Sequence, residues 1–564
     1  MREVSRRILG LYPYDVQILG ALALARGTIA ELATGEGKTL LQLLPAYYHS
    51  LSGKGVHVAT ANSYLAERDH AFGLPVYQAL GISSALLPER VSVAKKRVAY
   101  QADITYGTGS EFGFDYLRDQ LTLLRQPESV PGERTWKSLL GSDSRTLPLA
   151  QRGLHMAIID EADAILIDEA TTPLLISGKS HGENPGTSLY HAARNTIALL
   201  EEGLHFGFDA IKRQIWLTES GQQLAQAQSR EVDRNLLKRP WIKYVENALR
   251  AQYALDKDRQ YVVRNNEVLI IDECTGRVKQ GSSWRDGLHQ AVEAKEDQPI
   301  TCENESQASI SRQKFYRLYD HVGGMTGTAV EAAGEFWEVY QLPVVPIPLN
   351  KPSQRRTFPP RVFRTSSQKL NAAVVEIRRL YHTGQPVLVG TRTIENSERL
   401  SLLLNQAGIP HHLLNAKQDE GEAEVIAAAG QPHAVTISTN MAGRGTHIDL
   451  GDGVEALGGL HVLVLEMDES QRVDRQLLGR AARQGKVGSG QLFLSLEDSI
   501  MTRFAPDLAK RMAEKFEDSA EELPSSLSSR FLRVQSKAEQ KAYQDRLAIM
   551  EQDRWNDETK LRLA

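Results

Sequence analysis

The segment Glu31-Leu32-Ala33-Thr34-Gly35-Glu36-Gly37-Lys38-Thr39 decides the fold of this chain. It follows the short apolar run Thr28-Ile29-Ala30 and precedes an apolar helical pattern that begins at Leu40. Glycines let backbone N–H groups approach phosphate oxygens, and the start of a helix adds partial positive charge. Leu32 stands where the strict motif has glycine, but the order of strand, loop and helix predicts a phosphate-binding loop.

The chemistry of such a loop assigns its residues to a nucleotide and to Mg²⁺. We expect Lys38 to reach the β- and γ-phosphates and the Thr39 hydroxyl to bind Mg²⁺. The remaining nucleotide-binding positions of the loop are Thr34, Gly35, Glu36 and Gly37. Upstream, the Gln17 amide can donate and accept hydrogen bonds at once, so we expect it to read the adenine base. ATP and Mg²⁺ are therefore the predicted cofactors.

A second motif, Asp160-Glu161-Ala162-Asp163, ends the apolar run Ala157-Ile158-Ile159. In parallel α/β sheets, residues at the carboxyl ends of strands face the ligand. We therefore expect Asp160 to hold Mg²⁺ and Glu161 to orient and deprotonate the attacking water. A solvated acidic turn is the alternative, and the preceding apolar run argues against it.

A third motif, Gln476-Leu477-Leu478-Gly479-Arg480-Ala481-Ala482-Arg483, supplies two guanidinium groups three residues apart. We expect Arg480 and Arg483 to lie on one face of a helix and to act as arginine fingers on the transferred phosphoryl group. Gln476 is expected to contact the nucleotide. The Gly324-Met325-Thr326-Gly327-Thr328 stretch suits a nucleotide sensor at a strand end, although a plain turn would use the same residues.

Short β-rich runs alternate with helical patterns in two parts of the chain, which predicts two parallel α/β domains of the RecA-like P-loop type. Between them the rhythm breaks, and a hairpin pattern around residues 261–271 indicates an inserted module. We expect a first α/β domain (1–177 and 287–350), the inserted module (178–286), a second α/β domain (351–505) and a helical tail (506–564).

Bulk composition excludes several classes of protein. Hydrophobic residues make up 41 % and charged residues 24 %, as in ordinary globular domains. A net charge of −4 gives no global positive field for nucleic acid. The two cysteines, Cys274 and Cys302, form no zinc or redox motif, and no run is long enough to span a membrane. These features predict a cytoplasmic protein with at most peripheral membrane contact.

Several strings resemble the SecA family of preprotein translocase ATPases more specifically than the generic motor motifs do. They are residues 33–39, Phe112 to Asp119, Ile165 to Ala170, Gly287 to Glu296 and Asn440 to Thr446. The resemblance implies that the inserted module binds unfolded preproteins and that a SecY-type channel at the inner face of the plasma membrane is the partner. It also implies nucleotide contacts from Gly445 and Asp449. A full-length SecA or a second copy of the chain is a further expected partner, and nucleic acid is not.

The sequence departs from the family pattern at several positions. Tyr12 stands where arginine is usual, and His447 replaces the aspartate after Gly445-Thr446, where Asp449 is expected to take over part of the role. The tail resembles the start of the family's scaffold helix and then stops, so we expect neither its wing, its channel-entering finger nor its zinc site. These departures favour a reduced or accessory form.

Two other functions compete with that interpretation. A DEAD-type nucleic-acid helicase would share the Asp160 to Asp163 motif and the Ala33-Thr34-Gly35-Glu36-Gly37-Lys38-Thr39 loop. A non-motor, regulatory paralogue that holds preproteins would explain the short tail and His447. The inserted module and the family-specific strings argue against the first, and the complete set of ATPase residues argues against the second.

Overall fold

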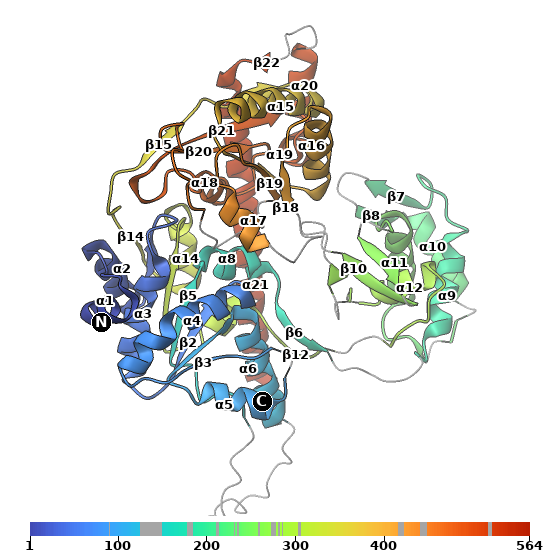
Figure 1. The fold of residues 1–564 in the computed structure, drawn as a ribbon. Coiled ribbons are helices and arrows are strands. Elements are labelled where there is room, and N and C mark those ends of the chain that lie inside the picture. Colours follow the sequence, from blue (N-terminus) through green and yellow to red (C-terminus); the bar gives the residue numbers. More distant parts are fainter. Residues whose placement is uncertain are drawn as a thin grey trace, which may run out of the picture.

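The computed structural model shows two α/β domains stacked on each other, with a third body beside them (Figure 1). It describes residues 1–563 except 90, 125–148, 178–183, 210–213, 230–231, 234–235, 258–259, 265, 272–277, 280–282, 285, 303–305, 415–421, 440–447 and 517–521. Within these residues, no helix is both long enough and apolar enough to cross a membrane.

The first α/β domain is built on a sheet of seven parallel strands in the order β14-β1-β13-β5-β2-β4-β3. The strands are β1 (Ile29–Glu31), β2 (Val56–Thr60), β3 (Ser84–Leu86), β4 (Ile104–Thr108), β5 (Met156–Asp160), β13 (His321–Thr326) and β14 (Val344–Pro346). The helical elements are α1 (Arg2–Leu9), α2 (Asp15–Ala25), α3 (Lys38–Ser50), α4 (Ser63–Ala79), α5 (Val93–Tyr100), α6 (Gly109–Leu124), α8 (Ala162–Leu166), η1 (Asp168–Thr171), α13 (Arg312–Tyr316), η4 (Val330–Ala332) and α14 (Ala333–Tyr340). Strands β1 and β5 both lie beside β13 and run parallel to it. The phosphate loop after β1 and the Asp160 to Asp163 motif at the end of β5 therefore lie at the same edge of the sheet.

The family-specific stretch in α6 has a structural role in this domain. Asp115 is completely buried and accepts hydrogen bonds from Lys96 Nζ at 2.8 Å and Tyr100 Oη at 2.9 Å. Lys96 is only 2 % exposed and also pairs with Glu111. Because a buried charge is tolerated only when it is paired, this cluster fixes α5 against α6.

The second α/β domain contains a sheet in the order β18-β19-β17-β20-β21-β16-β22, with β15 also paired to β21. All of its pairs are parallel except β16 with β22. The strands are β15 (Gln354–Thr357), β16 (Arg361–Phe363), β17 (Val387–Thr391), β18 (His412–Leu414), β19 (Val435–Thr439), β20 (Leu460–Val464), β21 (Val487–Ser495) and β22 (Glu522–Leu523). The helical elements are α15 (Ser366–Thr383), α16 (Ile394–Gln406), α17 (Glu422–Ala428), α18 (Gln471–Leu478), η5 (Arg483–Gly485), α19 (Ser499–Phe504), α20 (Pro506–Lys515) and η6 (Ser525–Leu527).

The inserted module has a hydrophobic core of its own and joins the first domain through two antiparallel strands, β6 (Leu174–Ser177) and β12 (Ser306–Ile310). Its elements are α9 (Thr187–Ile197), β7 (Phe206–Asp209), β8 (Gln214–Leu217), α10 (Glu219–Gln228), α11 (Trp241–Tyr253), β9 (Tyr261–Arg264), β10 (Glu267–Ile271), β11 (Val278–Lys279) and α12 (Leu288–Lys295). The expected boundary at residue 286 needs correction, because Leu288, Val292 and Ile300 belong to the core of the module. Helix α12 therefore lies with the module and not with the first domain.

The long helix α21 (Ser528–Leu563) runs behind both α/β domains and touches each of them (Figure 1). Toward the second domain, Gln535 donates to Asp474 at 2.7 Å. Toward the first domain, Arg546 makes a bidentate pair with Glu335 at 2.6 and 2.8 Å. Charge-assisted pairs of this geometry are among the stronger polar contacts in proteins, so α21 ties the two domains together.

Candidate functional site

The phosphate loop lies between β1 and α3, where two glycines adopt a backbone that other residues rarely take. Gly35 has φ 93° and Gly37 has φ 79°. A Cβ atom on Gly37 would lie 2.4 Å from Gln17 Nε2, and one on Gly35 would lie 3.0 Å from the Arg483 side chain. Because α3 begins directly after Gly37, its first N–H groups and its dipole point into the loop, which suits an anion such as phosphate.

Lys38 and Glu161 form a buried ion pair at the heart of this site. Lys38 Nζ lies 2.7 Å from Glu161 Oε1, and the two side chains are 12 % and 7 % exposed. Burial lowers the pKa of Lys38, but the carboxylates of Glu161 and Asp160 outweigh it and raise the pKa above its usual value. The lysine therefore stays charged, as phosphate binding requires. Glu161 itself has φ 52°, a left-handed backbone that costs a non-glycine residue about 1–3 kcal/mol.

Asp160 and Thr39 supply oxygen atoms of the kind that Mg²⁺ prefers. Burial, followed by the charge of Glu161, raises the pKa of Asp160 to about 7. A cation bound beside Asp160 would stabilise the ionised carboxylate, which burial and Glu161 disfavour. Thr39 Oγ1 donates to Asp69 Oδ1 at 3.3 Å, and Asp69 is completely buried. The oxygen atoms of Asp160 and Thr39, beside the glycine-containing phosphate loop, are suitable ligands for the Mg²⁺ ion of a bound Mg²⁺–nucleotide complex. Sequence reasoning missed Asp69, because only the packing of α4 on α3 brings it to Thr39.

Asp163 is the main polar link between the two α/β domains. Its completely buried carboxylate accepts hydrogen bonds from Thr326 Oγ1 at 2.6 Å and from Thr328 Oγ1 at 3.0 Å within the first domain. From α18 of the second domain it accepts one from Arg472 Nη1 and one from Gln476 Nε2, both at 2.8 Å. The expected sensor residues and Gln476 thus bind Asp163, so Gln476 is placed on a carboxylate rather than in the nucleotide cradle.

Arg472 extends this link further into the first domain. Its Nη2 donates to Asp168 Oδ1 at 2.5 Å, close to β6, the strand that leads into the inserted module. Arg472 was not singled out from the sequence, because an arginine on an amphipathic helix is usually solvated. Only the approach of the other domain gives it two acidic partners.

The two expected finger residues lie beyond the end of α18 and do not share one α-helical face: Arg480 follows the helix, and Arg483 begins the short 3-10 helix η5. Helix α18 ends at Leu478, and Ala482 has φ 60°, which breaks the expected helical face. Arg483 is half-buried against Gly35, and desolvation together with the neighbouring Arg480 lowers the pKa of its guanidinium to about 9. A guanidinium held beside the phosphate loop suits an incoming anionic group.

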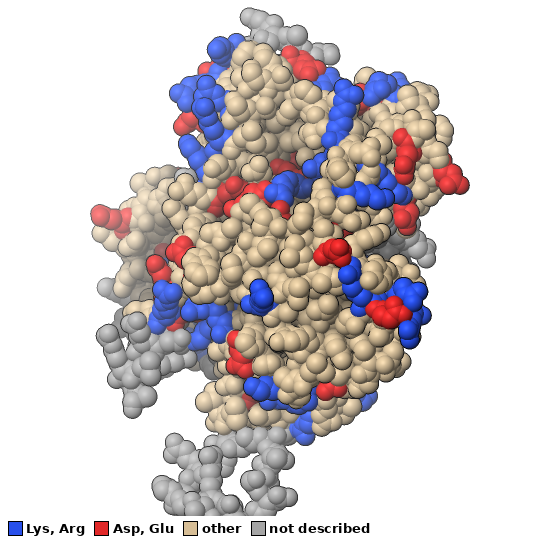
Figure 2. Space-filling view, turned by 90° about the vertical axis from the view of Figure 1, so that its left-hand side faces the viewer, with Lys and Arg blue, Asp and Glu red and all other residues tan. Residues whose placement is uncertain are grey.

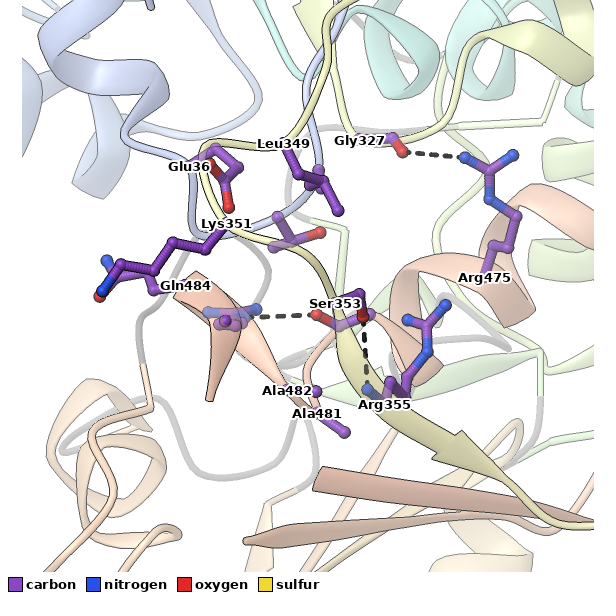
Figure 3. A pocket seen from close by; sticks show the side chains of 15 residues that line it. Glu36, Gly327, Leu349, Lys351, Ser353, Arg355, Arg475, Ala481, Ala482 and Gln484 are labelled. Carbon is purple, nitrogen blue, oxygen red and sulfur yellow. Dashed lines mark hydrogen bonds between the residues drawn. The ribbon is translucent and has the colours of Figure 1, made fainter. Parts of the chain in front are cut away.

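A cleft of about 140 Å³ separates the phosphate loop from the second domain (Figure 3). It is lined by Ala33, Thr34, Glu36, Gly327, Leu349, Lys351, Ser353, Arg355, Arg475, Gly479, Ala481, Ala482, Arg483, Gln484 and Gly485. Arg480 lines an adjoining smaller cavity together with Arg483. Both walls of the cleft therefore carry residues expected to contact nucleotide, and Gln484 bridges them by donating to the Gly35 carbonyl at 3.2 Å.

Two predicted positions, Gln17 and Asp449, lie outside the nucleotide cleft. Gln17 holds the phosphate loop in place, because its Nε2 donates to the Glu36 carbonyl at 2.8 Å while its Oε1 accepts from the Tyr14 backbone. Asp449 is exposed and does not line the cleft. Gly445 and His447 fall outside the described residues, so the nucleotide contact expected of Gly445 stays a prediction.

Comparison with known proteins gives a consistent picture. The model of the SecA DEAD-like domain matches residues 1–337, and that of the SecA P-loop domain matches 352–456 and 451–521. A "Protein translocase subunit SecA" of Oleidesulfovibrio alaskensis is 45 % identical over 91 % of this chain and 57 % of its own length. A "Protein translocase subunit SecA 2" of Geobacillus thermodenitrificans is 46 % identical over 91 % of this chain and 62 % of its own length. The chain thus spans about six tenths of the length of these relatives.

Among solved structures, S. cerevisiae Dbp5 bound to RNA covers 95 % of the chain and 96 % of its own length. Its sequence identity is 11 % and its TM-score 0.41, and the DEAD-box helicase Mss116 reaches 0.44 at the same identity. Likeness at this level carries no functional weight.

Proposed function

The chain belongs to the SecA family, and from that membership and the interdomain site we propose that it is an ATPase motor that binds and moves unfolded preproteins. ATP hydrolysis is the reaction that the residues support best. The relatives named as protein translocase subunits support the link to transport.

The observation that carries the proposal is the meeting of complementary groups across the domain interface. Lys38 would neutralise the β- and γ-phosphates, and Thr39 with Asp160 would hold Mg²⁺, which supplies charge neutralisation when bound. Glu161, 2.7 Å from Lys38, would leave that pair to orient and deprotonate water. Arg483, and Arg480 beside it, would stabilise negative charge on the transferred group.

Coupling to movement follows from the division of this site between two bodies. Because the guanidinium groups come from the second domain, hydrolysis requires it to close on the first. Arg472 binds Asp168 at 2.5 Å, and β6 begins a few residues later at Leu174. A shift of α18 therefore acts on the stem of the inserted module, the part expected to hold the preprotein.

We further propose that the partner is a SecY-type channel and that the protein works in the cytoplasm and at the inner face of the plasma membrane. A second copy of the chain or a full-length SecA is a candidate partner in a dimer. Polypeptide rather than nucleic acid fits the net charge of −4. In agreement with this, acidic and basic side chains are interspersed on the face drawn in Figure 2.

The test is steady-state ATP hydrolysis by the full chain in four conditions: alone, with an unfolded preprotein, with preprotein and vesicles that contain SecY, and with single-stranded RNA. We expect preprotein with channel vesicles to raise the rate several-fold and RNA to leave it unchanged. A rate that rises with RNA alone would favour a helicase. A rate that no addition changes, together with no preprotein binding, would refute the transport proposal.

A further inference from the structure

Helix α18 carries a third group that reaches the first domain. Arg472, Arg475 and Gln476 are spaced so that they share one face of the helix. Arg472 and Gln476 bind Asp163, as described above. Arg475 reaches a different place, at the base of the phosphate loop.

The guanidinium of Arg475 grips two carboxylates of the first domain. Nη2 donates to Glu31 Oε1 at 2.7 Å, and Nη1 pairs with Glu331. Glu31 is itself fixed, because its Oε2 accepts the backbone N–H groups of Ala329 and Val330 at 2.5 Å each. The Glu31 side chain is 13 % exposed and that of Arg475 is 37 % exposed, so water only partly screens the pair.

Glu31 and Arg475 lie next to opposite walls of the nucleotide cleft, and their contact joins the two walls. Glu31 ends β1 and directly precedes the phosphate loop, and Arg475 Nη2 also lies 3.4 Å from the Gly327 carbonyl, a bond drawn in Figure 3. On the other wall, Arg475 stands one helical turn before Gly479, where the loop to Arg483 begins. The contact therefore fixes the distance between the phosphate loop and the finger loop.

We propose that Arg475 is a positioning residue for ATP hydrolysis, which holds α18 and the Arg483 loop against the phosphate loop by gripping Glu31 and Glu331. This inference rests on the proposed ATPase function and deepens it. Arg475 acts through its neighbours and not on the phosphate. Because the Arg475 side chain is 37 % exposed, we expect its ion pairs to add little to stability. The main effect of removing Arg475 should therefore be on the hydrolysis rate, with a smaller effect on the unfolding temperature.

The experiment compares Arg475→Ala, Arg475→Lys, Glu331→Gln and the double variant Glu331→Gln/Arg475→Ala in the full chain. Arg379→Ala is the matched control, because Arg379 pairs with Glu376 within the same helix, α15 of the second domain. Misplacement of a reacting group by about 1 Å can cost about a hundredfold, so we expect Arg475→Ala to lower kcat by about tenfold. The KM for ATP should stay within about twofold, because the phosphate loop keeps its own residues.

Arg475→Lys should recover part of kcat, since an ammonium group can serve one carboxylate but not both. The double variant should be no slower than Arg475→Ala, because both changes remove the same contact. Unchanged or increased kcat in Arg475→Ala would overturn the inference. So would a fall of kcat and unfolding temperature together without any recovery by lysine, because that pattern indicates a merely structural role.

The two proposals fail in distinguishable ways. If preprotein and channel vesicles do not stimulate the wild type, transport fails, while the basal kcat ratio still decides the role of Arg475. If Glu161→Gln abolishes hydrolysis but Arg475→Ala does not slow it, the ATPase stands and the inference fails. A wild type that hydrolyses no ATP would overturn both.

Discussion

The two α/β domains share an architecture but bring opposite charges to their interface. The first domain contributes carboxylates from Glu31, Glu161, Asp163, Asp168 and Glu331. The second contributes the guanidinium or amide groups of Arg472, Arg475, Gln476 and Arg483. From this difference we expect that the phosphate-loop side binds a nucleotide alone. The guanidinium groups that we propose to favour hydrolysis come from the second domain.

The largest expected effect comes from the acidic side. Glu161→Gln removes the group that would deprotonate water but keeps its size, so we expect hydrolysis to fall by about 10²–10⁴-fold. Nucleotide binding should persist, because Lys38 loses its competing carboxylate partner. Rapid-quench kinetics and binding of a fluorescent ATP analogue measure the two quantities. Hydrolysis that persists near the wild-type rate would remove Glu161 from the chemistry.

An intermediate effect is expected at the main link between the domains. Asp163→Asn removes the charge that faces Arg472 in a buried site, and breaking such a pair costs about 3–5 kcal/mol. We expect kcat to fall by at least about tenfold and the thermal unfolding midpoint to drop by several degrees. Thr326→Val is the milder control, because it deletes only bonds inside the first domain, from Thr326 Oγ1 to Asp163 and from the Thr328 N–H to Thr326 Oγ1. Equal losses in both variants would mean that the cross-domain contact adds nothing.

The smallest effect is expected at Asp474, a buried acid on α18 of the second domain, which otherwise brings guanidinium and amide groups to the interface. Burial, followed by the charge of Asp468, raises the pKa of Asp474 to about 7, above the usual value near 3.8. For an acid with a raised folded-state pKa, the stability contribution present at low pH is lost as pH rises toward 7. We therefore expect the unfolding midpoint of the wild type to fall by a few degrees relative to Asp474→Asn between pH 5 and about 8. A difference independent of pH would contradict this assignment.

Much of this arrangement could be predicted from the sequence where local pattern decides structure. The strand before the phosphate loop, the buried strand that ends at Asp160 and the hairpin of β9 and β10 all follow from periodicity and turn residues. The helical context expected for Arg480 and Arg483 was wrong, because α18 ends at Leu478 and Ala482 has a left-handed backbone, although alanine is a good helix former. Intrinsic propensity is a weak guide where tertiary contacts fix the backbone.

Other features depend on contacts far apart in the sequence. Gln476 binds Asp163, 313 residues away, and Arg475 binds Glu31, 444 residues away. Nothing local distinguishes these side chains from a solvated helix face. The edge of the inserted module was misplaced for the same reason, because α12 is assigned by its packing on α11 and not by its own pattern.

The most direct test of the central claim, that the second domain supplies the charge for hydrolysis, is single-turnover ATP hydrolysis by the variant Arg480→Ala/Arg483→Ala. Arginine fingers contribute about 10³–10⁵-fold in rate. We predict a loss of about a thousandfold in the rate constant, with ATP affinity within a few-fold of wild type because the phosphate loop is intact. Hydrolysis at the wild-type rate, or a loss of binding as large as the loss of rate, would contradict the account.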